Sequence, residues 1–429
     1  MIAIIDALRE KQKLETVLKR NQFEFDAVNS SVTQIIYRVK KEGDLALLDL
    51  TKQFDGVKDP VLTVKKSDLE AALKRLDPKL RHALMRAADN IKAFHEKQRP
   101  NDFMIEKPGI TIQERTIAID SVGLYIPGGS AAYPSSVLMN AIPANVAGVK
   151  RIVMVSPPMP DGTLKDSVLA AAAIGGVDAV YMVGGAQAVA ALAYGTKTIP
   201  RVDKIVGPGN IYVTMAKRYL SGLVGIDTIA GPSEVAIVAD QDANPDFIAL
   251  DMMSQAEHDV YASALVLVDS ETMAENIKAA IIKRIGDQPR QAIIKESLST
   301  YGAIIITKDT QMSIDLVNQI APEHCEIHTV NPHEVAKKIK HAGAIFIGPY
   351  TPESIGDYYA GPNHTLPTSG VARFASALST RDFMKSSALV SYSKSALKSA
   401  KDDVIIIAED ETLQAHADAV KIRFEEEGV

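Results

Sequence analysis

The chain has 429 residues, a length that predicts two or three domains rather than one small module. Its hydrophobic content of 46% and charged content of 23% are those of an ordinary globular protein, which excludes a disordered polymer. The net charge of -6 lacks the basic excess of a general nucleic-acid binder, so we expect no nucleic-acid partner.

Cys325 is the single cysteine, so an intramolecular disulfide and paired-thiol redox chemistry are excluded. No uninterrupted apolar run approaches the roughly 18 residues that span a bilayer. The start of the chain places Asp6 and Arg9 where a signal peptide would be apolar. We therefore expect a cytoplasmic protein with no membrane partner.

The first hundred residues show helical periodicity and predict several short helices, including an N-terminal helical segment over 1–21. The three-four spacing is clearest in one run of apolar residues, Val32, Ile35, Ile36 and Val39. From about residue 120 the pattern changes to short β-branched runs that end in glycine or proline, each followed by a helix of small residues. The first strands expected in this part are 151–156, 178–185 and 203–209.

A second series of strands is expected at 234–240, 263–269, 302–307, 326–330 and 343–348. Continuous apolar strands that alternate with helices imply parallel sheets covered on both faces, with ligands at the carboxyl ends of the strands. The last sixty or so residues predict one more strand, at 404–409, and a helix from about Thr412. This tail would pack either on its own chain or on a partner.

Gln255 and His258 are the first residues whose spacing suggests a metal site. Asn244 and Pro245 are typical of a helix start, so two side chains three positions apart project from one helical face. An amide oxygen and an imidazole nitrogen are both metal ligands. A pair with this spacing alone is, however, more typical of a solvated helix surface.

Glu323 and His324 form an adjacent acid and base just before an expected strand. Such a pair can take protons from two atoms of one substrate, because an imidazole with a pKa of about 6.5 is a competent base at neutral pH. A plain surface turn is the alternative for this pair. Asp357, in a loop rich in glycine and proline, offers a hard oxygen ligand, with His364 close behind.

Glu411 and His416 lie near the start of the last helix, where His416 could equally be a surface residue. The earlier part of the chain contains four glycine-rich turns, GLYIPGGS, VGGAQAVAALAYGT, VGPGNIYVTMAKR and AGPSEV. None is a GxGxxG after a strand, which argues against an ordinary dinucleotide fold. Such turns still allow close backbone approach to phosphate, so plain loops and ligand contacts both remain open.

Together these segments resemble the histidinol dehydrogenase family over nearly the whole chain. The matching stretches include YPSSVLMNAIPANVAGV, VDKIVGPGNIYV, SQAEHD, APEHCEI, GDYYAGPNHTLPTSG and LQAHADA. The resemblance implies oxidation of L-histidinol to L-histidine, the last steps of histidine biosynthesis, with two NAD and one zinc per site. It also implies a homodimer of α/β chains, each with two incomplete Rossmann-like domains with parallel sheets, one inserted in the other, plus small terminal helical or strand segments.

The domains expected from the resemblance are 22–126 with 234–370, which would carry the zinc and catalytic residues, and 127–233 on the NAD side. Residues 371–429 would form a C-terminal segment that contributes to the partner's site. The resemblance makes Gln255, His258 and Asp357 zinc ligands, with His416 of the partner subunit completing the set. It places Tyr125, Gln187 and Asn210 on NAD, and it surrounds the substrate with Ser233, His364, Glu411, His324 and the four zinc ligands.

The family resemblance assigns Glu323 and His324 as the catalytic pair. His324 would be the base in both oxidations, and Glu323 would activate the water that hydrates bound histidinaldehyde. A Cys325 thiolate that traps the aldehyde is a competing mechanism. A zinc hydrolase and a related dehydrogenase with another substrate are alternative functions. A non-catalytic binding protein is disfavoured, because it would not need an acid and a base beside a ligand set.

Overall fold

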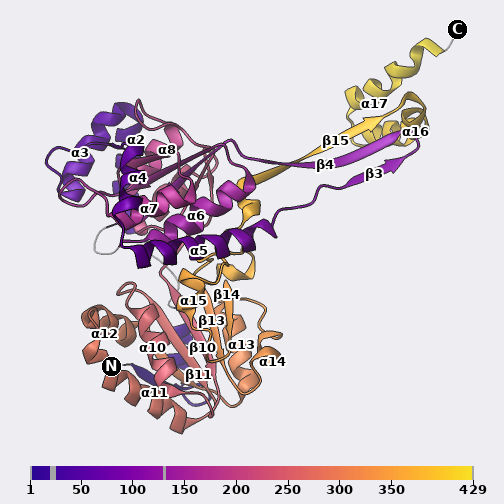
Figure 1. Ribbon diagram of the computed structural model, residues 1–429. Coiled ribbons are helices and arrows are strands. Elements are labelled where there is room, and N and C mark those ends of the chain that lie inside the picture. The colour runs from indigo at the N-terminus through magenta and orange to yellow at the C-terminus, as the bar shows by residue number, and fades with distance from the viewer. Residues whose placement is uncertain (1, 20–25, 129–131, 428–429) are drawn as a thin grey trace. The chain divides into compact units, whose positions relative to one another are not determined.

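The computed structural model describes residues 2–19, 26–128 and 132–427 and divides the chain into two compact units (Figure 1). Unit 1 comprises Met1–Gln98 and Ile119–Phe383, and unit 2 comprises Arg99–Ala118 and Met384–Val429. Unit 1 contains two six-stranded sheets, and unit 2 contains one sheet of three strands. Among the described residues, no helix combines the length and the apolar character needed to cross a bilayer.

The first sheet of unit 1 has the order β2-β7-β6-β5-β8-β9 and is parallel except for β2. Counted from β5, this is the order 3-2-1-4-5, in which the order of the strands reverses between β5 and β8 although the two strands are parallel. Three of the helices that cover it, α6, α7 and α8, consist mainly of small apolar residues and are apolar all round, as buried helices are. The strands are β2 Thr63–Val64, β5 Ser121–Tyr125, β6 Arg151–Ser156, β7 Ala179–Met182, β8 Lys204–Val206 and β9 Gly225–Ile226; the connecting helices are α6 Pro134–Ala147, α7 Asp166–Gly175, α8 Gly185–Tyr194 and α9 Ile211–Leu220.

The helices between residues 26 and 96 pack on this first sheet, which differs from the expected grouping of 22–126 with 234–370. Val32, Ile36 and Leu47 share one buried core with Leu192 and Ile205. Helical periodicity predicts that one face of a helix is buried but does not identify the sheet against which that face packs. The expected domain grouping differs from the structure for this reason. These helices are α2 Asp26–Glu42, α3 Asp44–Asp55, α4 Lys66–Arg75 and α5 Pro78–Glu96.

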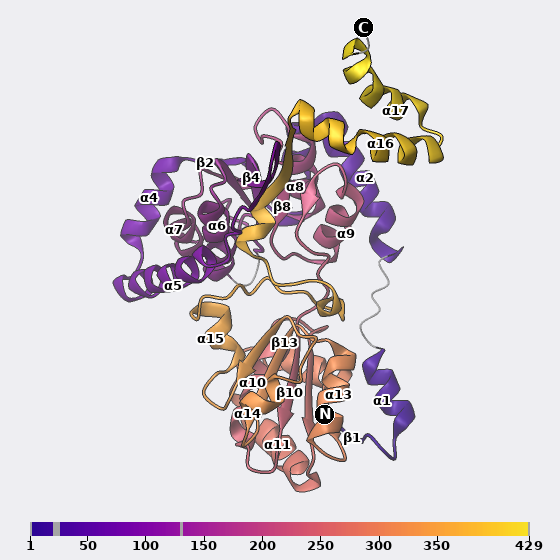
Figure 2. The ribbon, with the colours of Figure 1, turned by 90° about the vertical axis from the view of Figure 1, so that its right-hand side faces the viewer.

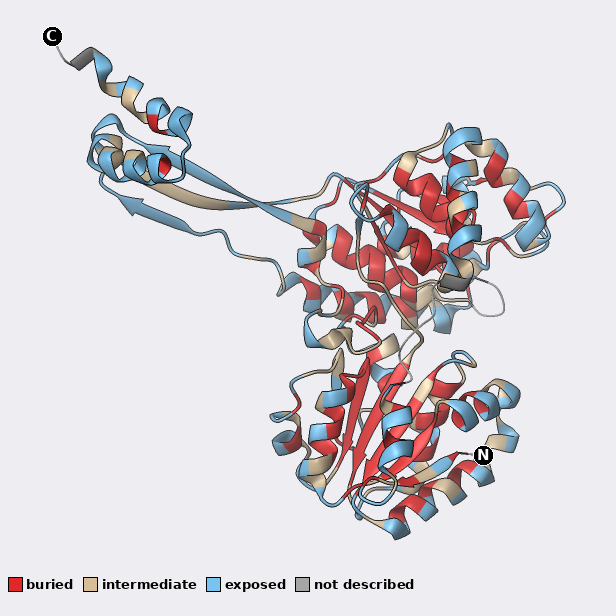
Figure 3. Ribbon diagram, turned by 180° about the vertical axis from the view of Figure 1, so that it is seen from behind, coloured by how far each residue is buried: buried red, intermediate tan, exposed pale blue. Residues whose placement is uncertain are grey.

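The second sheet has the order β1-β12-β11-β10-β13-β14 and is parallel throughout. Counted from β10, it repeats the 3-2-1-4-5 order and adds β1 at one edge. Its four central strands, β10 to β13, are buried on both faces, as the red ribbons of Figure 3 show. The strands are β1 Ala3–Asp6, β10 Glu234–Ala239, β11 Ser263–Val268, β12 Ala303–Ile306, β13 His324–His328 and β14 Ala344–Ile347.

The helices around this sheet are α1 Lys11–Leu18, α10 Pro245–Ala256, α11 Glu271–Arg284, α12 Gln291–Thr300, α13 Thr310–Ile320, α14 Pro332–Ala336 and α15 Glu353–Tyr358, with 3-10 turns at Ile285–Asp287 and Val371–Arg373. A third 3-10 turn, Thr380–Phe383, lies against α5, where the Thr380 hydroxyl donates to the His95 carbonyl oxygen. The N-terminal segment was expected to be purely helical, but it begins with strand β1, which pairs with β12. Helix α1 follows β1 (Figure 2). A four-residue strand is too short to show a period. The parallel strands expected from 151 to 348 are confirmed, although β13 begins two residues before the expected 326.

Unit 2 is an antiparallel sheet of β3 Met104–Lys107, β4 Ile110–Ala118 and β15 Met384–Tyr392, followed by α16 Lys394–Asp410, α17 Gln414–Lys421 and a 3-10 turn at Ile422–Glu427. The strand expected at 404–409 is wrong, because this segment lies inside α16. A short β-branched run does not distinguish a strand from a helix. Here the segment is helical because residues that favour helices flank it and because Ser393 caps the helix. The Ser393 side chain accepts from the Ala396 N–H.

Candidate active site

Strand alternation on β13 separates the catalytic candidates from the core. His324, Glu326 and His328 occupy one face, and the neighbours Cys325 and Ile327 belong to the apolar core on the other face. His324 and Glu326 pair in register with two β10 residues of the core that contains α10. The catalytic face of β13 therefore looks towards α10.

Glu323 and His324 lie at the amino end of β13, whereas ligands were expected at the carboxyl ends of the strands. For the second sheet that expectation is wrong. Helix α10 follows β10 and runs back along the sheet, so Gln255 at its end and His258 just beyond return to the amino side. The site is built where a returning helix ends, a feature that strand patterns do not reveal.

His324 is surrounded by carboxylates. Its Nδ1 lies 3.1 Å from the Glu234 carbonyl oxygen, 3.7 Å from Glu323 Oε2 and 3.8 Å from Glu353 Oε1, and its Nε2 lies 3.6 Å from Asp357 Oδ1. Burial alone would lower the pKa of His324, but the negative charges of Glu353, Glu323 and Asp357 outweigh it and hold the pKa well above the usual value. The imidazole therefore has a high proton affinity.

Glu323 is buried beside His324 and is held by the backbone. Its Oε2 accepts a hydrogen bond of 2.9 Å from the Glu234 N–H. Burial raises the pKa of Glu323 to about 7. Burial, with the charge of Glu323, raises the pKa of Glu234 to about 8. A carboxyl group with a pKa near 7 can both give and take a proton at neutral pH.

Gln255, His258 and Asp357 come together beside His324, as the sequence suggested, and Glu353 joins them. The ligand atoms of His258, Glu353 and Asp357 lie within 4.8 Å of one another. With the Gln255 amide turned so that both ends are satisfied, its nitrogen donates to Glu353 Oε2 at 2.8 Å and Oε1 at 3.1 Å. Glu353 was not predicted, although it lies one helical turn before Asp357, a spacing that places both on one face.

The donor set fits a zinc ion. Burial lowers the pKa of His258, which favours the neutral imidazole that a metal requires. Burial works to raise the pKa of Asp357, but His324 and the other nearby histidines more than offset it and keep the carboxylate ionised. Imidazole nitrogen with carboxylate and amide oxygen is a combination that suits this borderline cation.

A cavity of about 870 Å³ opens on this cluster. It is lined by six of the predicted residues, Ser233, His258, Glu323, His324, Asp357 and His364, and by Asn210. His364 is fixed between Ser136 Oγ, 3.2 Å from its Nε2, and the Asp357 carbonyl oxygen, 3.0 Å from its Nδ1. A small polar substrate in this cavity would lie against both the acid–base pair and the metal candidates.

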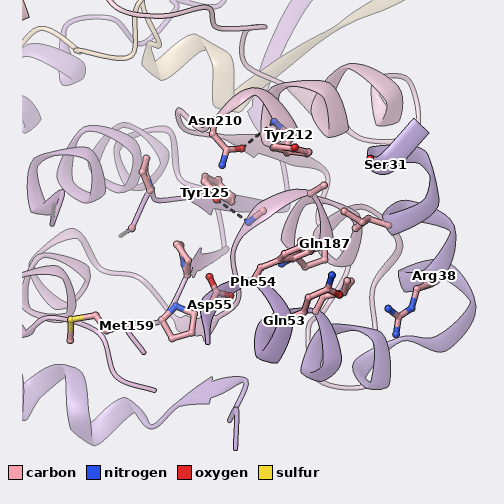
Figure 4. A pocket seen from close by; sticks show the side chains of 18 of the residues that line it. Ser31, Arg38, Gln53, Phe54, Asp55, Tyr125, Met159, Gln187, Asn210 and Tyr212 are labelled. Atoms are coloured by element: carbon pink, nitrogen blue, oxygen red, sulfur yellow. Dashed lines mark hydrogen bonds between the residues drawn. The ribbon is translucent and has the colours of Figure 1, made fainter. Parts of the chain in front are cut away.

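A second cavity, of about 1050 Å³, lies at the carboxyl ends of β5, β6, β7 and β8 (Figure 4). Tyr125, Gln187 and Asn210 line it together, as expected of the cofactor residues. The Gly185 N–H at the start of α8 donates to the Tyr125 hydroxyl at 3.0 Å, and Asn210 caps α9. The two cavities share Pro127, Gly128, Asn210 and Tyr212, so one long ligand could occupy both.

A buried ion pair holds the loop that joins the two cavities. Lys217 pairs with Asp227 and donates to the Gly207 carbonyl oxygen at 2.8 Å, while Asp227 Oδ2 accepts from the Gly207 N–H at 2.7 Å. Gly207 has φ +109°, and a Cβ there would lie 2.1 Å from the Tyr125 carbonyl oxygen. Only glycine fits this position, three residues before Asn210.

Beyond His324, the same face of β13 carries a second buried polar group. His328 Nε2 lies 3.3 Å from Glu326 Oε2 and 3.6 Å from Asp251 Oδ2 of α10. Burial, with the charge of Glu326, raises the pKa of Asp251 to about 8. The sequence analysis did not identify this group, although Asp251 precedes Gln255 by one helical turn.

Three other candidates are not among the residues that line the cavity beside His324. Glu411 and His416 belong to unit 2, where both are exposed, so the site of unit 1 is described without them. Cys325 is fully buried on the core face of β13, and burial raises the pKa of its thiol to about 12. A protonated thiol that faces away from His324 does not support the trapping of an aldehyde.

Comparisons with known proteins agree with this site. The family model for histidinol dehydrogenase matches residues 18–424. Histidinol dehydrogenase of Listeria monocytogenes is 52% identical over 93% of this chain and 94% of its own, and that of Halalkalibacterium halodurans is 47% identical over 100% and 99%. The crystal structure of the Elizabethkingia anophelis enzyme superimposes with a TM-score of 0.93 at 34% identity and covers 100% of this chain and 99% of that chain. The chain belongs to the histidinol dehydrogenase family, whose members are oxidoreductases.

Proposed function

We propose that this chain is a zinc- and NAD-dependent enzyme that oxidises L-histidinol to L-histidine in two steps, through bound histidinaldehyde and its hydrate. The observation that carries the proposal is the continuity of the two cavities through Asn210 and its neighbours. A cofactor bound in the first sheet's cavity can reach a substrate held at His324, whereas a hydrolase would need no second cavity. We also propose a cytoplasmic location, as for other enzymes of amino-acid biosynthesis.

In this proposal Gln255, His258 and Asp357 hold zinc. When bound, zinc would supply a positive charge that orients the substrate's nitrogens, and NAD would accept hydride. Glu353 supports the set, because its carboxylate accepts from the Gln255 amide nitrogen and thereby fixes the orientation of that side chain.

His324 and Glu323 divide the proton transfers between them. In the first oxidation the hydroxyl proton must leave as hydride leaves carbon, and His324, which lines the substrate cavity beside Glu323, is the group we assign to accept that proton. An aldehyde yields an acid only after hydration, so a base must activate water between the steps. Glu323, with a pKa of about 7, supplies that base, and His324 then deprotonates the hydrate.

We further propose that the enzyme is a homodimer in which Glu411 and His416 of the partner subunit complete the site. Among the described residues of unit 2, only Ala408 and Ala417 are fully buried. Several large apolar side chains of unit 2 are exposed, among them Phe103, Met104, Val390, Ile406 and Ile407. An antiparallel sheet and two helices with this surface need another apolar face to cover them, which a second copy would provide.

The decisive experiment supplies the purified protein with zinc, NAD and L-histidinol and counts both NADH and histidine. Two NADH per histidine are expected. A hydrolase would form no NADH, and a dehydrogenase for another substrate would leave histidinol unchanged. A verified zinc-free sample that kept full turnover would refute the metal assignment.

The dimer has its own test. Ile406→Lys places a charge on the exposed apolar surface of α16 and should shift the molar mass measured by light scattering from dimer to monomer, with loss of turnover. Mixing His416→Asn chains with His258→Asn chains should restore part of the activity, because a mixed dimer would carry one intact site. A His416→Asn protein with full zinc affinity and turnover would argue against the shared site.

A further inference from the structure

Asp55 places a carboxylate in the cavity assigned to NAD. It is the last residue of α3 and lines the cavity together with Tyr125 and Gln187. Its Oδ2 atom is buried and has no hydrogen-bond partner among the residues that the structure describes. Burial raises the pKa of Asp55 to about 6, so the group is largely ionised at neutral pH. An ionised oxygen without a donor is costly unless a ligand supplies one.

No cation of the cavity lining neutralises this carboxylate. Arg38 lines the same cavity, but its guanidinium donates to Asp49 Oδ2 at 2.7 Å and to Glu42 Oε2 at 3.3 Å. The arginine is thus engaged by its own acidic partners. The carboxylate of Asp55 remains an acceptor that faces a ligand cavity, and hydroxyl groups are the donors it fits.

The strand topology shows which hydroxyl groups these would be. In dinucleotide-binding sheets an acidic residue at the end of the second strand binds the ribose of adenosine. The second strand here is β6, and Pro157, Pro158, Met159 and Pro160 follow it; the next residue, Asp161, is not among the lining residues of this cavity, and its carboxylate accepts from the Thr163 N–H and hydroxyl. All three prolines and Met159 line the cavity, as Asp55 does.

The position of Asp55 gives the cofactor a direction. Asn210 belongs to both cavities and therefore marks the end nearest the catalytic pair. In the view of Figure 4, Asp55 lies on the Met159 side of the cavity, with Tyr125 between it and Asn210. A dinucleotide with its nicotinamide near Asn210 would bring its adenosine ribose towards Asp55.

We propose that Asp55 binds the hydroxyls of the adenosine ribose and thereby selects NAD over NADP. This inference rests on the proposed function, in which NAD occupies the cavity. The carboxylate accepts from the 2′-hydroxyl of NAD, whereas the 2′-phosphate of NADP would bring a second negative charge against it. Helix α3 thus supplies from outside the sheet what the end of β6 lacks.

The test measures dissociation constants by calorimetry on the zinc-loaded protein with NAD, NADP and nicotinamide mononucleotide, which has no adenosine. Asp55→Asn should weaken NAD by about 10-fold or more, as expected for the loss of a charged hydrogen bond. It should leave the mononucleotide unchanged and shift the NAD-to-NADP preference towards NADP. In steady state, KM for NAD should change more than kcat. Asp59→Asn, the same change at an exposed residue four positions on, is the matched control.

A second measurement alters the ligand instead of the protein. The wild-type protein should bind 2′-deoxy-NAD about 10-fold more weakly than NAD, and Asp55→Asn should bind the two alike. Two results would overturn the assignment of Asp55: an Asp55→Asn protein with an unchanged ratio of NAD affinity to NADP affinity, or a wild-type protein that binds NAD and 2′-deoxy-NAD equally well. In both cases the binding of NAD by the wild-type protein would still support the proposed function. A wild-type protein that binds no NAD would overturn both.

Discussion

Removal of the buried cation at Lys217 should destabilise the protein and disturb the cofactor cavity together. The side chains of Lys217 and Asp227 are each only 4% exposed. Lys217→Met keeps a long apolar chain but leaves the Asp227 carboxylate buried without a counter-charge and the Gly207 carbonyl without its lysine donor. Both consequences fall on the loop that leads to Asn210.

The expected magnitude follows from the burial of both partners. Removal of one member of a buried ion pair costs about 3–5 kcal/mol of unfolding free energy. At about 2–4 °C per kcal/mol for a domain of 150–250 residues, the melting temperature should fall by roughly 6–20 °C. An exposed pair differs: Lys337 and Glu334, 69% and 68% exposed, should lose at most about 1 kcal/mol in Lys337→Met.

Calorimetric melting of the two variants and titration with NAD test this reasoning. In the double variant Lys217→Met with Asp227→Asn, the unpaired charge is gone and an oxygen remains for the Gly207 N–H, so at least half of the lost stability should return. The affinity for NAD should likewise be lowest in Lys217→Met, intermediate in the double variant and highest in Lys337→Met. If the unfolding free energy of Lys217→Met were within about 1 kcal/mol of that of Lys337→Met, the ion pair would not be what holds this loop.

Three further outcomes are expected. The pKa of Asp251 is raised to about 8 in the folded protein, above its unfolded value of about 4, so the folded state binds the extra proton and the unfolding free energy should fall on the order of 4 kcal/mol as pH rises from 5 to 9; Asp251→Asn should flatten that profile in melts of metal-free protein. Cys325→Ala should cost about 1–2 kcal/mol of stability through a small cavity but still yield two NADH per histidine, and loss of the second oxidation alone would restore the thiol mechanism. Glu323→Gln should form the first NADH and then stall, so histidine production should fall much more than single-turnover NADH, and equal losses in both would contradict its assignment to hydration.

The fold could be predicted from the sequence wherever a local pattern is sufficient. β-branched runs bounded by glycine indicated β6, β10, β11 and β12 within a residue or two. The pattern failed in unit 2, where half-exposed strands at 110–118 and 384–392 carry no buried alternation and an apolar run lies in α16 instead. Which sheet the early helices cover depends on contacts far apart in sequence, and local periodicity carries no such information.

The residues of the site likewise divide into those that local sequence motifs predicted and those that they did not. His258 and Asp357 are brought together as the motifs suggested, because each motif sits on a rigid helix end. Glu353 was missed, since its importance comes from facing His324 across the fold rather than from any neighbour in sequence. Asp55 was missed for a similar reason: it belongs to a helix outside the sheet whose cavity it enters.

The two-sided character of β13 restricts how this enzyme can evolve. A deletion or insertion of one position just before His324 would rotate every later side chain of the strand by half a turn. The thiol of Cys325 would then enter the reaction chamber, and an imidazole and a carboxylate would be driven into hydrocarbon. A shift of the strand by one residue would thus disturb the site and the core together, whereas a substitution on one face affects the site or the core alone.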